Sequence, residues 1–201
     1  MNDLGAADRF TTMLIEDAVR HSLDVWHAYG RCFEGILLIR RGDFARGLAR
    51  LRSAGGQLRQ AGFTQYYTPY LAALAEGLAG SRQIAAGLAA IDEALVRAEN
   101  TEERWCLAEL LRIKGELVIL EDAPNAAVAA ERCFLGSLDW AGTQQALSWE
   151  LRTATSLARL WKHQLRDAEA RELLARVYGR FTEGFATTDL RKAKTLLEQL
   201  A

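Results

Sequence analysis

The sequence predicts an all-α protein, and three observations support this fold class. Alanine and leucine together make up about a third of the 201 residues, whereas valine and isoleucine are scarce. Helices favour alanine and leucine, and strands favour β-branched residues. Proline occurs only twice, at Pro69 and Pro124. The third observation is a pattern of small and large apolar residues that recurs about every 40 positions.

The recurring pattern has three columns of residues, each repeated four times. The first small residue recurs after 40, 40 and 43 positions, the second after 40, 43 and 40, and a large apolar residue stands four positions after the second. The columns are Gly35, Ala75, Gly115 and Ala158; Gly47, Gly87, Ala130 and Ala170; and Leu51, Ile91, Phe134 and Leu174. Small residues permit close helix crossing, and a large residue one turn later fills the gap. Each repeat is therefore predicted to be a hairpin of two helices, whose core is completed by its neighbours.

Turn signals divide the chain into roughly ten helices. Gly42 can end one helix and Asp43 can cap the next. Gly62 and Gly80-Ser81 mark later breaks, residues 100–103 offer N-cap candidates, and Gly142-Thr143 closes a further helix. The expected helices span 6–20, 22–41, 43–61, 66–80, 83–99, 102–120, 125–142, 146–163, 166–181 and 188–200.

These helices predict a single helical-repeat domain over residues 1–201. Residues 1–21 form a partial N-terminal repeat, and residues 186–201 form a C-terminal capping helix. The hairpins between them span 22–61, 64–100, 102–143 and 146–182. The expected architecture is a right-handed superhelical solenoid of antiparallel helix hairpins.

Several function classes leave no signal in this sequence. A formal net charge of −1 at pH 7 gives no nucleic-acid footprint, and no apolar run approaches the length of a bilayer span. Neither a phosphate-binding loop nor an HExxH or CxxC motif is present. Three cysteines do not predict a disulfide framework, and the first ten residues do not show the pattern of a signal peptide. We therefore expect a cytoplasmic protein without catalytic residues, metal site or cofactor.

The two small-residue columns resemble those of the tetratricopeptide repeat family, in a degenerate form with a period near 40 instead of 34. A narrower resemblance covers nearly the whole chain. The stretches GRCFEGILLIRRGDFARGL, ERWCLAELLRIKGELVI, SWELRTATSLARLW and EARELLARVYGRFTEGFATTDLRKAKTLLEQL are similar to the C-terminal repeat region of large bacterial multidomain ATPases. Those proteins are transcriptional regulators or class III adenylate cyclases.

The resemblance implies a module for protein interaction or sensing within a longer parent protein. Its partner would be a protein or peptide, another domain of the parent chain, or an effector. Met1 would then be the start of a fragment, and the exposed end of a cut repeat array would favour a homodimer. The alternative function is a purely structural oligomerisation element. An enzyme would need a buried polar constellation, and none is visible in the sequence.

The first helices of stacked hairpins line the concave face of a repeat array, which makes this face the candidate binding surface. The candidate residues are Tyr29, Ile36, Arg40, Glu76, Ala79, Glu109, Arg112, Glu116, Arg152, Thr155, Arg159 and Lys162. Helical spacing predicts ion pairs of Arg112 with Glu109 and with Glu116. Arg152, Arg159 and Lys162 form a basic set in the fourth repeat. It is either a solvated face or a clamp for an acidic peptide, a terminal carboxylate or an anionic ligand.

Aromatic residues offer a weaker signal. Trp105, Trp149 and Trp161 are expected to pack between hairpins, with ligand stacking as the alternative. Phe181 and Phe185 are expected to anchor the connection into the last helix in the core.

Overall fold

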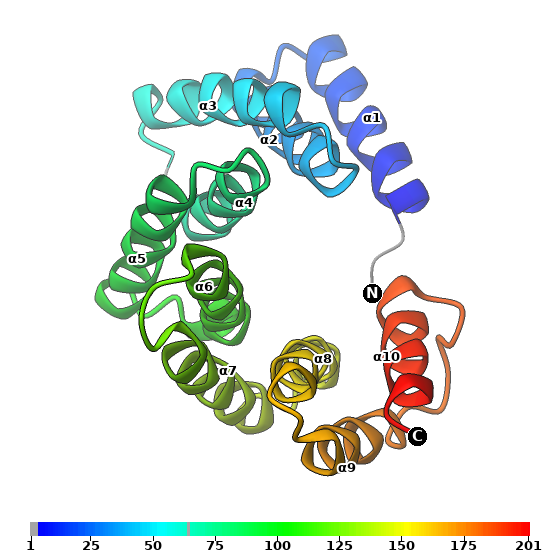
Figure 1. Cartoon of the computed structure of the whole chain (residues 1–201). Helices are drawn as coiled ribbons and strands as arrows, with labels where there is room; N and C mark the ends of the chain where they lie inside the picture. The colour runs from blue at the N-terminus through cyan, green and yellow to red at the C-terminus, as the bar shows by residue number, and fades with distance from the viewer. Residues whose placement is uncertain (1–3, 64) are drawn as a thin grey trace. The chain divides into compact units, whose positions relative to one another are not determined.

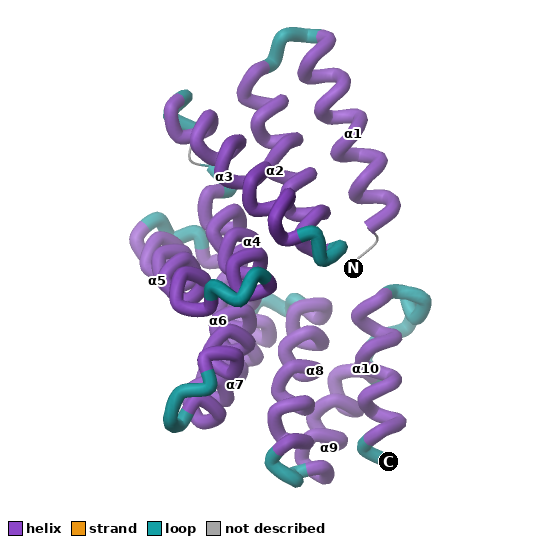
Figure 2. Tube along the Cα trace, turned by 45° about the horizontal axis from the view of Figure 1, so that its top comes forward, coloured by secondary structure: helices purple, strands orange, loops and turns teal. Residues whose placement is uncertain are grey.

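The computed structural model describes residues 4–63 and 65–201, in which it contains ten α-helices and no strand (Figures 1 and 2). The all-α prediction is confirmed. The helices are α1 (Leu4–Arg20), α2 (Asp24–Arg40), α3 (Phe44–Gln60), α4 (Tyr67–Gly80), α5 (Ile84–Asn100), α6 (Leu107–Glu121), α7 (Ala126–Thr143), α8 (Leu147–His163), α9 (Asp167–Tyr178) and α10 (Thr188–Gln199). Residues 1–3 of the expected partial repeat and residue 64, the expected start of the second hairpin, lie outside the described residues.

Most helix bounds agree with the sequence prediction to within two residues, and two differ more. The helix expected at 102–120 opens with a 3₁₀ turn, Arg104–Cys106, before α6 begins at Leu107. Helix α9 ends at Tyr178, three residues early. Of the two phenylalanines expected to anchor the connection into the last helix, Phe181 packs against the core, whereas Phe185 is about half exposed.

The chain forms two compact units, Leu4–Glu102 and Glu103–Ala201. In the N-terminal unit each helix from α1 to α5 packs against the next, and α2 also packs against α4. In the C-terminal unit consecutive helices pack in the same way, and α8 contacts both α6 and α10. Within this unit α6, α8 and α10 lie along one face, and α7 and α9 along the other (Figure 1). The single repeat domain over 1–201 stays a prediction.

All twelve positions of the three sequence columns are buried. A Cβ atom added at Gly47 would lie 2.6 Å from Cγ1 of Ile39 and 2.9 Å from the carbonyl oxygen of Gly35. A Cβ atom at Gly35 would lie 2.9 Å from Cγ of Leu51. The two small residues therefore face each other where α2 and α3 cross, and the large residue fills the adjacent space as predicted.

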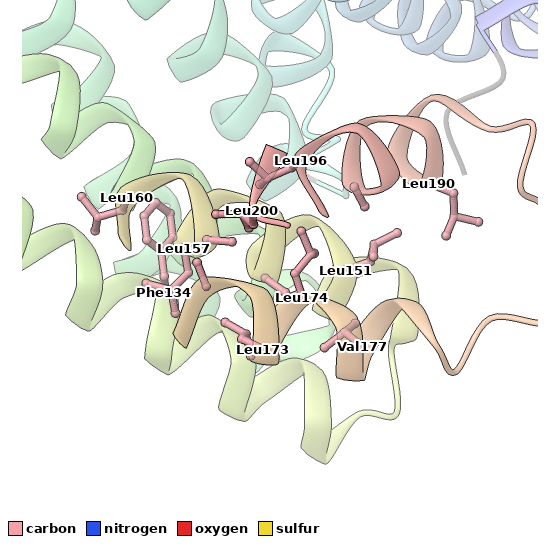
Figure 3. Packing of buried hydrophobic residues seen from close by; sticks show 14 of the residues in the cluster. Phe134, Leu151, Leu157, Leu160, Leu173, Leu174, Val177, Leu190, Leu196 and Leu200 are labelled. Carbon is pink, nitrogen blue, oxygen red and sulfur yellow. The ribbon is translucent and has the colours of Figure 1, made fainter. Parts of the chain in front are cut away.

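The core of the C-terminal unit lies between α7, α8, α9 and α10 (Figure 3). Phe134 of α7 and Leu157 of α8 are completely buried, and so is Leu174 of α9. Leu190 and Leu196 place one stripe of α10 on the same cluster. Burial of this stripe fixes the neighbouring polar face of α10 beside α8, which matters for the candidate site below.

Each helix from α1 to α8 is followed within two residues by a residue in the left-handed backbone region. These residues are Ser22, Gly42, Gly62, Arg82, Glu102, Asp122, Gln145 and Leu165. They are spaced by 20 residues, except for 23 between Asp122 and Gln145. At six of these ends the next residue's N–H donates to a carbonyl five residues earlier, as in Asp43 to Leu38 at 2.9 Å. This is the Schellman pattern of helix termination, and it sets a half-repeat of 20 residues.

One turn prediction is wrong for a local reason. Asn100 and Thr101 were expected to cap the following helix, but Asn100 is the last residue of α5. The hydroxyl of Thr101 instead donates back to the carbonyl of Arg97 at 2.9 Å. The end predicted at Gly142-Thr143 is confirmed, because α7 ends at Thr143, whose hydroxyl donates to the carbonyl of Asp139 at 3.0 Å. Threonine at a helix end satisfies a carbonyl here, and the turn is made by the residue with positive φ.

Replacing Leu165 with glycine is expected to stabilise the chain by about 0.5 kcal/mol. The side chain is 87% exposed, so no packing is lost, while φ is +61°. In this backbone region a non-glycine residue costs about 1–2 kcal/mol relative to glycine. Glycine loses more conformational freedom on folding, which offsets about 0.5–1 kcal/mol of the gain. Urea denaturation measures the change. Leu135→Gly, at a half-exposed position inside α7, should instead lose about 1 kcal/mol. Equal destabilisation by both variants would refute the prediction.

Candidate functional site

A groove runs between α6, α8 and α10 of the C-terminal unit, and it has two compartments. The inner compartment encloses about 110 Å³ and is lined by Arg112, Glu116, Arg152, Thr155, Ser156, Arg159, Asp189 and Lys192. The outer compartment encloses about 580 Å³ and is lined by Arg159, Lys162, His163, Thr188, Arg191, Lys192, Thr195, Leu196 and Gln199. Arg159 and Lys192 line both compartments, so the two are continuous.

An ion-pair network fixes the side chains of the inner compartment. The guanidinium of Arg112 donates to both carboxylate oxygens of Glu109, each at 2.9 Å. Arg152 reaches the same carboxylate from α8 at 2.6 Å. Glu116 lies 3.6 Å from Arg112 and accepts a hydrogen bond from Ser156 at 2.5 Å. Both ion pairs predicted for Arg112 are confirmed.

The network makes the inner compartment nearly neutral. The carboxylates of Glu109 and Glu116 balance the cations of Arg112 and Arg152. Arg112 is only 7% exposed, and a buried cation is stable only when it is paired and hydrogen-bonded. The Arg152 cation is therefore already committed to Glu109, and the basic set expected in the fourth repeat loses this member.

The outer compartment has the opposite electrostatic character. Arg159 and Lys162 of α8 are joined there by Arg191 and Lys192 of α10, and no carboxylate lines the compartment. Lys162 donates to the neutral Gln199 side chain at 3.0 Å. Within the described part of the chain, Arg159, Arg191 and Lys192 form no ion pair. Because residues 103–201 hold as many acidic as basic side chains, this is a local segregation of charge.

The remaining predicted binding residues lie in the N-terminal unit. Tyr29 is buried, its hydroxyl donates to the carbonyl of Gln65 at 3.0 Å, and its ring meets Tyr66 edge-on. Tyr29 and Ile36 line a small apolar pocket of about 40 Å³, rather than an open face. Arg40, Glu76 and Ala79 do not line this pocket; Arg40 is exposed at the end of α2, and the other two are partly buried on α4.

The sequence analysis missed the contribution of α10 to the groove. Thr188, Lys192, Thr195 and Gln199 stand three or four residues apart and so share one helix face. The spacing is visible in the sequence, but residues 186–201 were expected only to form a capping helix. Only the packing of α10 against α8 turns that stripe into a wall of the groove.

Core packing was expected for the tryptophans, and it is confirmed for Trp161 but not for Trp105. Trp161 packs against the core and donates to Glu131 at 2.7 Å, as a structural residue would. Trp105 is half exposed, although core packing was expected for it, and its ring lies 6.3 Å from that of Trp149. The 3₁₀ turn at Arg104–Cys106 turns Cys106 inward and leaves Trp105 at the surface.

Cys32 and Cys106 are expected to resist alkylation by iodoacetamide at pH 8. Burial raises the pKa of each thiol from its usual value of 9.0 to about 11, so the thiolate fraction at pH 8 is about 0.1%. The folded state holds these protons more tightly than the unfolded state, so its stability should fall as pH rises from about 9 through 11. Peptide mapping after labelling, with and without urea, measures the protection. Equal labelling in both conditions would contradict it.

Comparisons with known proteins do not assign a function to this groove. No protein-family model matches the chain, and a search of curated proteins finds no match. Among residues 4–63 and 65–201, no group of three histidine, cysteine or acidic side chains is placed to hold a metal ion. None of the helices described in those ranges is long and apolar enough to cross a membrane.

Proposed function

We propose that the chain is a non-catalytic interaction and sensor module, the C-terminal repeat region of a cytoplasmic bacterial signalling or transcriptional regulator. Its degenerate tetratricopeptide-like repeats would form a right-handed solenoid of helix hairpins. The first-helix face would bind a peptide, a partner domain or an effector. The observation that carries the proposal is the groove itself, where three helices distant in sequence converge on a cationic surface.

The structure of the groove supports binding rather than chemistry. Of the acidic side chains at the groove, Glu109 and Glu116 are held by arginines and Ser156, which leaves these two poorly placed to act as proton donors or acceptors. The exposed cations Arg159 and Lys192 are available to an acidic partner. A ligand that bound one conformation of the parent protein more tightly would shift its balance between active states.

A labelled acidic peptide tests this proposal. We expect a fluorescein-labelled decapeptide of glutamate to bind the chain in an anisotropy titration, and a decapeptide of glutamine to bind at least tenfold more weakly. Added salt should weaken binding because the contacts are exposed. The double variant R159E/K192E should lose at least tenfold in affinity.

The matched control is R132E/R171E, which makes the same charge change on α7 and α9. Both side chains are exposed and neither lines the groove. Binding that is equally weak in both variants would show a response to overall charge and would overturn the assignment of the groove.

The alternative function, an oligomerisation element, is favoured by one observation. Phe10, Met13 and Val19 of α1 are each more than half exposed. Exposed apolar surface of this kind tends to become an interface. Light scattering on the purified chain distinguishes the two functions. A stable homodimer that F10E/M13E dissociates, together with no binding of the glutamate peptide, would favour the oligomerisation element.

A further inference from the structure

We infer that the outer compartment binds a small anion with two or more linked phosphates, such as pyrophosphate or a nucleoside polyphosphate. This inference rests on the proposed function and names the ligand class for one end of the same groove. It is carried by the charge, the size and the hydrogen-bonding groups of the compartment.

The four cations of the compartment favour a ligand that carries several negative charges. Arg159 and Lys162 stand within one turn of α8, and Arg191 and Lys192 are adjacent on α10, which packs against α8. His163 is the only other titratable side chain in the lining. Like charges gathered without counter-charges destabilise a folded chain, and a bound anion relieves that repulsion. One carboxylate would balance only one of four cations, whereas a single phosphate ester carries about −1.5 to −2.

The size and polar groups of the compartment suit a small ligand. Its volume of about 580 Å³ lies within the range of about 300–1,000 Å³ typical of small-molecule sites. The hydroxyls of Thr188 and Thr195 and the amide of Gln199 add neutral donors beside the cations. Arginine, lysine and hydroxyl groups are the usual donors to phosphate oxygens. Leu196 is the single apolar residue of the lining, so affinity must come from charge and hydrogen bonds.

The surroundings of the compartment disfavour a long nucleic-acid strand. At the inner end of the groove a continuing phosphate backbone would meet paired arginines and the carboxylates of Asp189 and Glu116 rather than further free cations. The acidic and basic side chains of residues 103–201 are equal in number, so no extended cationic surface is expected beyond the groove. A compact anion meets the four cations and avoids these carboxylates.

Calorimetric titration of the full chain with sodium pyrophosphate tests the inference. At constant ionic strength and pH 7.5, we expect pyrophosphate to bind at least tenfold more tightly than sulfate or citrate. It should also raise the melting temperature of the wild-type chain. ATP should bind at least as tightly as pyrophosphate if the natural ligand is a nucleotide, and more weakly if it is a smaller phosphate anion.

Variants locate the site. Lys162 and Arg191 line only the outer compartment, so K162Q/R191Q should lose at least tenfold in pyrophosphate affinity. The control R132Q/R171Q removes the same charge from α7 and α9 and should keep the affinity of the wild-type chain. The melting shift of the wild-type chain tests binding even where a variant fails to fold.

Three results would overturn the inference: no pyrophosphate binding, equal affinity for citrate, or tighter binding of a single-stranded DNA 12-mer. The proposed function would survive the first two results if the glutamate decapeptide still bound in a manner sensitive to R159E/K192E. Loss of peptide binding as well would remove the proposed function together with the inference.

Discussion

Replacing Phe134 with alanine is expected to lower the free energy of unfolding by about 3–5 kcal/mol, because it leaves a cavity in a closely packed core. The ring is completely buried on α7 within the cluster shared by α7, α8, α9 and α10. One edge of it lies over Gly115 of α6, where an added Cβ atom would be 2.5 Å from Cε1. Urea denaturation followed by circular dichroism measures the loss. A cost below about 1 kcal/mol would contradict this packing.

Gly115 provides a sharper test of the same contact. G115A should cost about 1–3 kcal/mol through overpacking, since the added Cβ atom would lie within 2.9 Å of three atoms of the Phe134 ring. In the background of F134L the same change should cost at least 1 kcal/mol less, a coupling that only residues in contact show. Gly136 of α7 is the matched control, because its added Cβ would meet only Leu111, at 3.6 Å. G136A should therefore stabilise the chain by about 0.5–1 kcal/mol.

Replacing Arg112 with methionine is expected to cost about 3 kcal/mol. Arg112 and Glu109 are a buried pair joined by two hydrogen bonds, and removing one partner leaves a buried charge uncompensated. The cost lies at the low end of the usual range because Arg152 still contacts Glu109 at 2.6 Å. Arg20→Met serves as the control, since its pair with Asp17 is exposed and should contribute less than about 1 kcal/mol.

Chemical denaturation of R112M and R20M gives the comparison directly. Equal losses would show that the Arg112 network behaves as a surface pair. A larger loss for R112M would support a rigid ion-pair network at the inner compartment, which Thr155 and Ser156 of α8 also line. Thr155 is itself held by a hydrogen bond to the carbonyl of Leu151 at 2.7 Å.

The helices and their crossing points could be predicted because they depend on residues close together in the sequence. Gly35, Gly47 and Leu51 show the pattern that close helix crossing requires, and they meet in the structure. Turns were harder to predict because most of their left-handed residues are not glycine. Arg82, Glu102 and Leu165 carry no turn signal of their own. Their positions follow from the 20-residue half-repeat, which cannot be recognised from the side chains at these positions.

The groove shows the other limit of prediction. Helical register placed Arg112, Arg152 and Arg159 on one expected face, and all three line the inner compartment. Which of these arginines are paired with a carboxylate could not be predicted, because Glu109 pairs with Arg152, 43 positions away in the sequence. Similarly, Arg191 and Lys192 became groove residues only through the packing of α10 against α8.

The sequence by itself therefore determined the fold class, the helices and the small residues at which they cross, since helix propensity and residue volume act locally. Tertiary structure alone decided which cations are paired and which are free to meet a ligand. The reason is that Coulomb energy and desolvation depend on distance and burial in space. In this chain the buried apolar stripe of α10, with Leu190 and Leu196, sets the distances of Arg191 and Lys192 from α8.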